Sequence, residues 1–227
     1  MFLSLVVLPA TGCDGSAETN HRPLYTFAVC SGNRTEGIDN GVLPRIIESA
    51  KSRGAAFMVD TGDISSGGKS DAWASIIGAT YFSFDYAGDH FVVVDNADDR
   101  TGIDAEQLQW LDTDLAANAG KPRQFIFAHI PVADPSLPSG HVSGEKGGEG
   151  LRSGQQLVEK ARHYGNVGDF FFGHIHAYLA YRLDDMDAYV TGGAGAPLHF
   201  PESSGGYFHY LLVGVWPNRV DVEVIRI

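Results

Sequence analysis

The sequence has few cysteines, few basic residues and no long apolar run. Its 227 residues include two cysteines, Cys13 and Cys30, which are too few for a disulfide framework. Lys and Arg number 16 against 28 Asp and Glu, which gives a formal net charge of −12. This acidic balance, without a run of Lys or Arg, argues against a nucleic-acid or anionic-membrane surface. No apolar run approaches the ~20 residues that span a bilayer.

What is present is typical of a globular chain with many turns. Hydrophobic residues make up 44% and charged residues 19%, and 28 glycines accompany 10 prolines. This composition is too apolar for a disordered chain, and the length fits one large domain or two small ones. Because the chain is acidic overall, an anionic substrate would need local positive charge at its site, such as a metal ion.

The N-terminal segment resembles an export signal. Residues 2–8 are mainly apolar and are followed by small residues that end in Gly12-Cys13, a pattern similar to a bacterial lipoprotein cleavage site. We expect residues 1–24 to be a signal or lipoprotein-like segment and tether, with Cys13 lipidated, and residues 25–227 to form the domain. The protein would then be exported to the periplasm or cell envelope and tethered to the membrane by that lipid.

Two features of this segment depart from the lipoprotein pattern. No Lys or Arg precedes the apolar stretch, and Ala10 stands where the pattern prefers Leu. The alternative is an N-terminal strand with an incidental cysteine.

Fully apolar strands that alternate with helices indicate a sheet covered on both faces. Other strands follow one another with few helices between them, so we expect an α/β chain with two sheets packed face to face and helices outside. Helices are predicted over 42–52, 104–115 (with Asp104 as N-cap) and 154–164. Strands are predicted over 24–30, 56–59, 80–86, 90–95, 125–128, 169–172, 178–183, 188–191, 207–216 and 219–227.

Polar side chains follow four of the apolar strands. The sequences after these strands are Ser31-Gly32-Asn33-Arg34, Gly62-Asp63, His129-Ile130-Pro131 and Gly173-His174-Ile175-His176. In open α/β sheets, sites form just outside the carboxyl ends of the strands. Neighbouring strands would therefore bring together one carboxylate and three imidazoles, those of Asp63, His129, His174 and His176.

One carboxylate and three imidazoles make a transition-metal donor set. Imidazole-rich sites suit Zn, Fe or Mn, whereas Mg or Ca would prefer oxygen ligands. An extended backbone places the imidazoles of His174 and His176 on one side of the chain. They can then serve two adjacent metals, or one metal on each side of a bridging Asp63.

Each of these residues also has a simpler interpretation. A single histidine after a strand is usually exposed or hydrogen-bonded, and Gly-Asp after a strand is a common turn. His-x-His after three phenylalanines is harder to explain in this way, because two imidazoles at a buried edge need partners.

His141, in the Pro/Gly/Ser-rich surface loop 134–150, is a candidate for substrate contact. The remaining histidines are expected to be structural or exposed: His21, His90, His163, His199 and His209.

Taken in order, Gly62-Asp63, His129-x-Pro131 and Gly173-His174-Ile175-His176 resemble the motifs of the calcineurin-like metallophosphoesterase superfamily. Residues 173–178, 189–198 and 207–213 are similar to its bacterial purple-acid-phosphatase-like branch. The resemblance covers residues 25–227 and implies a four-layer αββα sandwich, two mixed sheets flanked by helices. It also implies a two-metal site at one sheet edge.

The resemblance further implies an activity. Such enzymes are metal-dependent hydrolases of phosphomonoesters or phosphodiesters, in which a metal-bound hydroxide attacks phosphorus. By motif, Asp63 would bridge the metals, and Asp63 and His129 would be catalytic. His129 and His174 would hold one metal, and His176 the other. The expected cofactor is one or two Fe, Zn or Mn ions, and the expected partner is a small phosphoester.

Two departures from the family pattern weaken the second metal position. Gly32 stands where the first motif has an Asp, and no Gly-Asn-His-Asp/Glu string lies between Asp63 and residue 81. An Asn ligand and a His that helps protonate the leaving group therefore have no counterpart. Loss of a general acid typically costs ~10²–10⁴-fold in rate. The chain is then either an impaired one-metal enzyme or a catalytically degenerate member that acts as a binding module, unless the gene sequence itself has lost a segment.

Arg34 can compensate in part as a phosphate clamp, because guanidinium pairs bidentately with phosphate oxygens. We therefore assign Arg34 a catalytic and substrate-binding role and Asn33 a substrate-binding role. The simpler interpretation of Arg34 is a surface salt-bridge partner.

Overall fold

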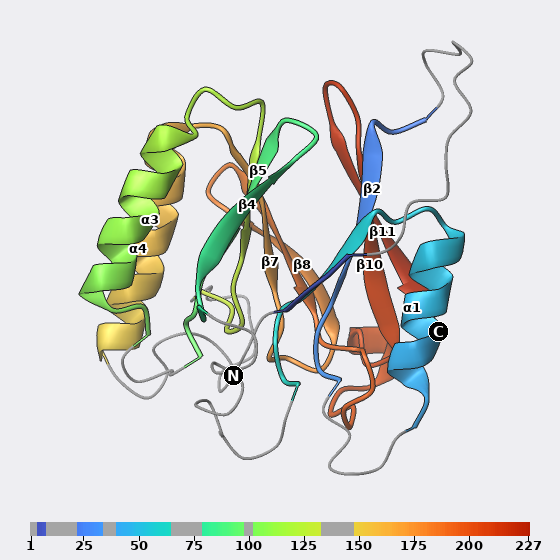
Figure 1. Cartoon of the computed structure of the whole chain (residues 1–227). Helices are drawn as coiled ribbons and strands as arrows, with labels where there is room; N and C mark the ends of the chain where they lie inside the picture. Colours follow the sequence, from blue (N-terminus) through green and yellow to red (C-terminus); the bar gives the residue numbers. More distant parts are fainter. Residues whose placement is uncertain (1–3, 8–21, 34–39, 65–78, 98–101, 133–147) are drawn as a thin grey trace.

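The computed structural model describes residues 4–7, 22–33, 40–64, 79–97, 102–132 and 148–227. Two β-sheets pack face to face, and helices cover the outer face of each sheet (Figure 1). The expected α/β class, a four-layer αββα sandwich of two mixed sheets flanked by helices, is confirmed.

The first sheet, sheet A, has five strands in the order β1-β3-β2-β10-β11. Their bounds are Ser4–Val7 for β1, Tyr25–Cys30 for β2, Phe57–Asp60 for β3, His209–Val215 for β10 and Val220–Arg226 for β11. Strands β2 and β3 run parallel, whereas β1 and β10 pair antiparallel with them and β11 with β10.

The second sheet, sheet B, has six strands in the order β4-β5-β6-β7-β9-β8. Their bounds are Phe82–Tyr86 for β4, Asp89–Val93 for β5, Gln124–Phe127 for β6, Val167–Phe172 for β7, Tyr178–Leu183 for β8 and Met186–Thr191 for β9. The four central strands are parallel and the two edge strands antiparallel. The carboxyl ends of four strands therefore meet at one edge.

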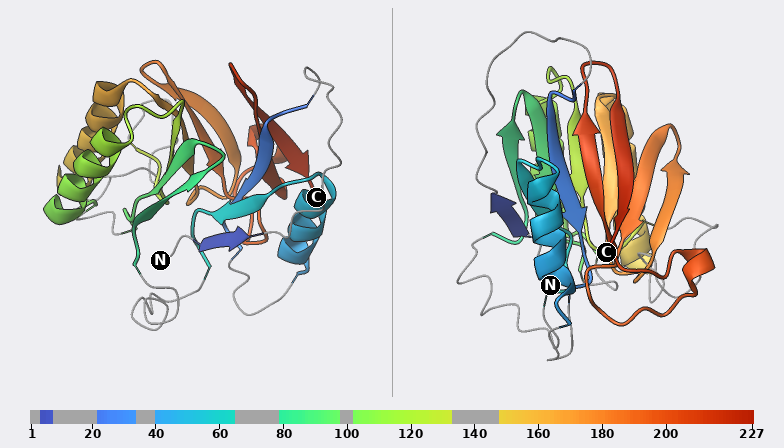
Figure 2. Two further views of the ribbon diagram at one scale, coloured as in Figure 1. Left: turned by 45° about the horizontal axis from the view of Figure 1, so that its top comes forward. Right: turned by 90° about the vertical axis from the view of Figure 1, so that its right-hand side faces the viewer.

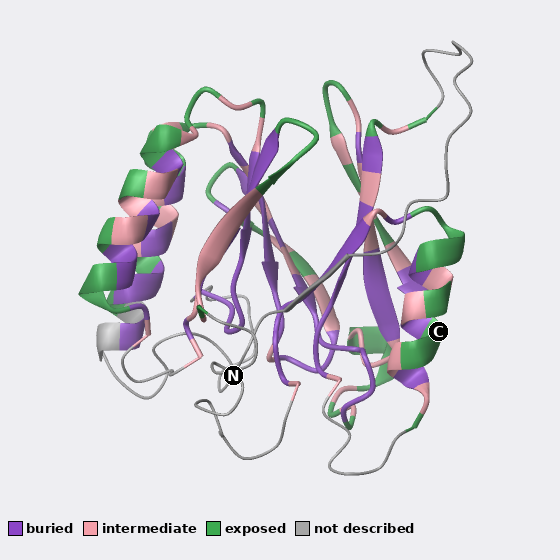
Figure 3. Cartoon of the chain, viewed as in Figure 1, coloured by how far each residue is buried: buried purple, intermediate pink, exposed green. Residues whose placement is uncertain are grey.

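Three described α-helices form the outer layers. Helix α1 (Val42–Ser52) covers sheet A, and its Ile46 packs in one apolar cluster with Met58 of β3. Helices α3 (Ala105–Ala117) and α4 (Gly148–Tyr164) lie side by side on sheet B (Figure 2). Each helix turns a buried face to its sheet and an exposed face outward (Figure 3). None of the helices in the described ranges is both long and apolar enough to cross a membrane.

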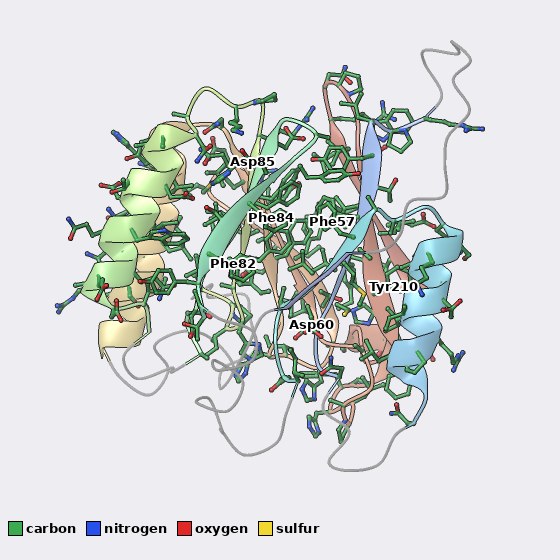
Figure 4. All side chains as sticks on the ribbon, viewed as in Figure 1. Phe57, Asp60, Phe82, Phe84, Asp85 and Tyr210 are labelled. Atoms are coloured by element: carbon green, nitrogen blue, oxygen red, sulfur yellow. The ribbon has the colours of Figure 1, made fainter. Side chains whose placement is uncertain are left out.

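Aromatic rings fill the space between the sheets. Phe27 of β2 stacks on Phe57 of β3 with ring centroids 5.3 Å apart, and it meets Phe91 of β5 edge-on at 5.4 Å. The ring of Phe57 also meets that of Phe84 edge-on, at 5.6 Å, and both are labelled in Figure 4. Such rings bury large areas and lock the two sheets in one relative position.

The predicted helix boundaries agree with the structure at both ends of α1 and at the start of α3. Asp104 caps α3, as predicted, by accepting a hydrogen bond from the Gln107 backbone N–H at 2.8 Å. The predicted start of α4 is wrong, because the helix begins at Gly148 rather than at residue 154. Glycines disfavour a helix locally, and a tertiary contact supports the early turns, in which Ser153 Oγ accepts from the Ile103 N–H at 3.0 Å.

The N-terminal residues Ser4–Val7 form β1, which pairs with β3 at the edge of sheet A. This arrangement corresponds to the strand alternative for these residues. Cys13 lies outside the described residues, so export and lipidation stay predictions.

Candidate metal centre

The turns that follow β3, β6 and β7 bring polar side chains to one edge of the sandwich. Asp63 follows β3, His129 follows β6, and His174 and His176 follow β7. The turns after β6 and β7 are joined directly, since the Gly173 N–H donates to the His129 carbonyl at 2.9 Å. This edge is the carboxyl end of the parallel strands, where sites of α/β sheets form. Asp60, the last residue of β3, is labelled in Figure 4 and shows where this edge lies in the molecule.

Two of these side chains are presented by strained backbone. Among the described residues, four non-glycine residues have positive φ, and Ala87 and Asp184 lie in hairpin turns. The other two are Asp63, with φ 63°, and His174, with φ 64°. A left-handed backbone is costly for L-residues and clusters at functional sites. The turns therefore adopt a conformation that local preference disfavours but that directs both side chains to the same place.

Three of the four predicted side chains converge within metal-ligating distance. Asp63, His129 and His174 each offer one ligand atom, and these atoms lie within 4.8 Å of one another. His129 Nε2 is 3.1 Å from His174 Nδ1 and 3.9 Å from Asp63 Oδ2. Asp63 and His129 are buried, whereas His174 is partly exposed. The group is therefore largely buried and reaches the solvent at His174.

The protonation of His129 fits a bound cation. Its Nδ1 lies 2.8 Å from the Thr61 carbonyl, which can only accept, so Nδ1 carries the proton. Burial is the main reason why the pKa of His129 falls to about 3, and Asp63 opposes this only partly. The ring is therefore neutral near pH 7, and the lone pair on Nε2 faces His174 and Asp63. A carbonyl that fixes the tautomer in this way is the usual partner of a metal-ligating histidine.

His176 joins the same group through Asp63. Its Nε2 lies 3.2 Å from Asp63 Oδ2, and its Nδ1 donates to the Pro197 carbonyl at 2.8 Å. The structure thus brings together all four side chains that the sequence predicts, with Asp63 between His129 and His176. Their roles as ligands stay predictions.

Asn96 is a supporting residue that the sequence reasoning missed. Its Oδ1 accepts the backbone N–H groups of His129 and Ile130, each at 2.9 Å, and its Nδ2 donates to the Ile130 carbonyl at 2.7 Å. Asn96 is buried and follows β5, the neighbour of β6. Its position just after an apolar strand is the same signal that identified the histidines.

Asp60, the last residue of β3, was also missed. Its carboxylate accepts the Asn33 side-chain amide at 2.6 Å and the Gly62 N–H at 2.9 Å. The pKa of Asp60 is raised to about 8, because burial and the nearby charge of Asp63 raise it by more than the Gly62 hydrogen bond lowers it. Asp60 therefore holds the turn that presents Asp63. The amide of Asn33 is engaged there, so its predicted contact with substrate stays a prediction.

Gly32 occupies a position that only glycine fits. Its φ is +71°, and a Cβ there would lie 2.6 Å from the Gly192 carbonyl oxygen and 3.3 Å from His176 Cδ2. An aspartate at this position would require the backbone to move. The turn is therefore built for glycine, and position 32 offers no side chain that could ligate a metal.

Two predicted substrate contacts, Arg34 and His141, lie outside the described residues, as does His21. Among the histidines expected to be structural or exposed, His90 and His209 are buried and His163 is exposed. His199 is exposed as well, but its ring stacks on that of His176. Nothing in the sequence near His199 indicates this contact with the site.

Comparison with known proteins adds information on the fold. The sequence matches no protein-family model and no curated protein. A dimetal phosphatase from Danio rerio is similar, with a TM-score of 0.66 and 14% identity, over 89% of this chain and 96% of that chain. GAP50, the anchor in the inner membrane complex of Plasmodium, is similar with a TM-score of 0.64 and 10% identity, over 89% of this chain and 84% of that chain. At such identities the likeness shows the fold alone: this chain shares its fold with these two proteins.

Proposed function

We propose that this chain is a metal-dependent hydrolase of phosphoesters. The observation that carries the proposal is the convergence of Asp63, His129 and His174 within 4.8 Å at the carboxyl edge of the sandwich. The dimetal phosphatase with the same fold supports it. Because the chain carries a net charge of −12, a cation at this edge would also offset the field that repels an anionic substrate.

In this proposal the chain's own residues hold and orient the cation. Asp63, His129 and His174 are its ligands, and the Thr61 carbonyl keeps Nε2 of His129 free to coordinate. A divalent or trivalent Fe, Zn or Mn ion suits this donor set. When bound, the ion lowers the pKa of water and neutralises charge on the phosphate oxygens. Arg34 and His141 are proposed to contact the substrate.

The test is turnover by the purified protein. p-Nitrophenyl phosphate reports monoesterase activity and bis-p-nitrophenyl phosphate diesterase activity, each assayed with Mn, Zn or Fe. We expect turnover that requires the metal and is lost in His174→Ala. The matched control is His163→Ala, which removes an exposed histidine of α4 and should leave turnover unchanged. Turnover no higher than that of His174→Ala would contradict the proposal.

A second candidate function is a non-catalytic binding module. It is favoured by Gly32, whose φ of +71° and contact with Gly192 exclude the first-motif aspartate. GAP50, described as an anchor, has a similar fold. Metal analysis of the purified protein separates the two candidates, because fewer than about one tightly bound ion per chain would leave no metal-assisted hydrolysis.

We also propose export to the cell envelope with a lipid on Cys13, on the strength of the N-terminal pattern. Membrane fractionation of cells that express the chain or its Cys13→Ser variant tests this. Wild-type protein in the membrane fraction and variant in the soluble fraction is the expected result, and equal distribution would contradict it.

A further inference from the structure

The segment after β9 is fastened to the candidate site by backbone hydrogen bonds. The Ala194 N–H donates to the Ser31 carbonyl at 2.9 Å, and the Ala196 N–H donates to the Gly32 carbonyl at 2.6 Å. Asn40 adds a side-chain bond, from Nδ2 to the Gly195 carbonyl at 2.7 Å. The segment is therefore held against the turn after β2.

This segment places His199 against a predicted metal ligand. The Pro197 carbonyl accepts Nδ1 of His176 at 2.8 Å, and two residues later the ring of His199 lies nearly parallel to that of His176. The ring centroids are 5.5 Å apart and the planes differ by 18°. His176 is buried, whereas His199 is exposed. The stack thus extends from the buried site to the surface.

The ring nitrogens of His199 are available to a ligand. Within the described part of the chain, its ring makes the stacking contact but no hydrogen bond through either nitrogen. By contrast, His176 and His129 each use Nδ1 on a backbone carbonyl. The Asn33 amide, a predicted substrate contact, is engaged with Asp60. His199 is therefore an exposed histidine beside His176 whose ring nitrogens make no hydrogen bond to the described residues.

We infer that His199 is a substrate-contacting residue that donates a hydrogen bond to a phosphoryl oxygen of the bound phosphoester. The inference rests on the proposed function and deepens it, because it adds a donor beside His176, where the chain lacks the first-motif aspartate at position 32. An imidazole suits this task since its N–H can donate to an anionic oxygen while the ring face stays stacked.

Three variants separate a donor role from a stacking role. His199→Phe keeps an aromatic ring against His176 but removes the donors. His199→Asn keeps a donor without the ring, and His163→Ala, on α4, is the control for loss of an exposed histidine. The measurements are binding of inorganic phosphate to the metal-loaded protein by calorimetry, metal content, and KM and kcat for p-nitrophenyl phosphate.

We expect His199→Phe to bind phosphate about 10- to 100-fold more weakly, the effect of losing one hydrogen bond to a charged group. Its KM should rise by a similar factor with a smaller change in kcat, because the contact is made to the bound substrate as well as to the transition state. His199→Asn should recover part of the affinity. Metal content should stay the same in all variants.

Other outcomes overturn the inference. Wild-type affinity in His199→Phe would mean that the ring only stacks, and a lower metal content would mean that it acts through His176. If the wild-type protein turns over substrate but His199→Phe shows the same KM, the inference fails and the proposed function stands. If the wild-type protein neither binds phosphate nor turns over substrate, both fail.

Discussion

Two buried histidines at opposite ends of sheet B have pKa values that shift in opposite directions, although both are hidden from water. His129 is 1% exposed and His90 is 3% exposed. Burial lowers the pKa of His129 to about 3. Burial also lowers the pKa of His90, but hydrogen bonds to Asp114 and Asp85 outweigh it and leave the pKa raised. Burial alone therefore does not decide whether a histidine is neutral.

The partners of each ring account for the difference. Nδ1 of His90 lies 2.7 Å from Asp85 and Nε2 lies 2.8 Å from Asp114, so each nitrogen has a carboxylate as its neighbour. Nδ1 of His129 donates to the Thr61 carbonyl and Nε2 faces His174. The first ring ties the β4–β5 hairpin to α3, and the two carboxylates favour its protonated form. The second keeps a lone pair, which is what a metal ligand requires.

The largest expected effect comes from removing the charge at the metal centre. Asp63→Asn should lower the affinity for Zn or Mn by more than about 100-fold, since even the outer partners of metal ligands are worth 10–100-fold. Metal analysis after dialysis against a competing chelator measures this. Asp185→Asn, in the exposed turn between β8 and β9, is the control and should bind metal as the wild type does. Equal metal content in Asp63→Asn and the wild type would contradict the site.

Gly32→Ala tests the backbone of the turn beside the candidate metal centre. A Cβ at φ +71°, 2.6 Å from the Gly192 carbonyl oxygen, should lower the free energy of unfolding by about 2–4 kcal/mol. Urea denaturation measures it. The matched control is Gly120→Ala, where no heavy atom lies within 4 Å of the added Cβ and φ is ordinary. A Gly32→Ala protein as stable as Gly120→Ala would mean that the turn is not built for glycine.

His90→Gln tests the buried histidine at the opposite end of sheet B. It should lower the free energy of unfolding by about 1.5–3 kcal/mol, because two charge-assisted hydrogen bonds are lost or weakened. The folded pKa of His90 lies above its ordinary value of about 6.5, so its contribution is complete below about pH 6.5 and is lost as the pH rises through the folded pKa.

The stability difference between wild type and His90→Gln should therefore shrink as the pH rises above about 6.5, as measured by urea denaturation at each pH. The exposed His163→Gln should show no such trend. A difference that grows with pH would mean that His90 is neutral in the folded protein, like His129.

The smallest expected effect belongs to Asp104, at the start of the helix whose later residue Asp114 holds His90. Asp104→Ala should lower the free energy of unfolding by about 1 kcal/mol, because the Gln107 N–H loses its acceptor. Asp104→Asn should restore most of it, since Asn caps helices about as well. Thermal unfolding of the two variants side by side measures both, and equal losses would show that the side-chain oxygen is not what matters.

The sequence by itself determined the layers of the fold and the membership of the candidate site. Apolar strands that end in Asp63, His129, His174 and His176 can be recognised locally, because strand burial and the residue after the strand both leave a sequence pattern. The cap at Asp104 is equally local.

Only the tertiary structure decided which groups support these residues and in what charge state. Asn96 holds the backbone of His129, Asp60 holds the turn before Asp63, and His199 stacks on His176. The charge of His90 depends on Asp114, a residue of another element. Such contacts join side chains that are far apart in the sequence, and the pKa of a buried group depends on those neighbours rather than on its own residue type.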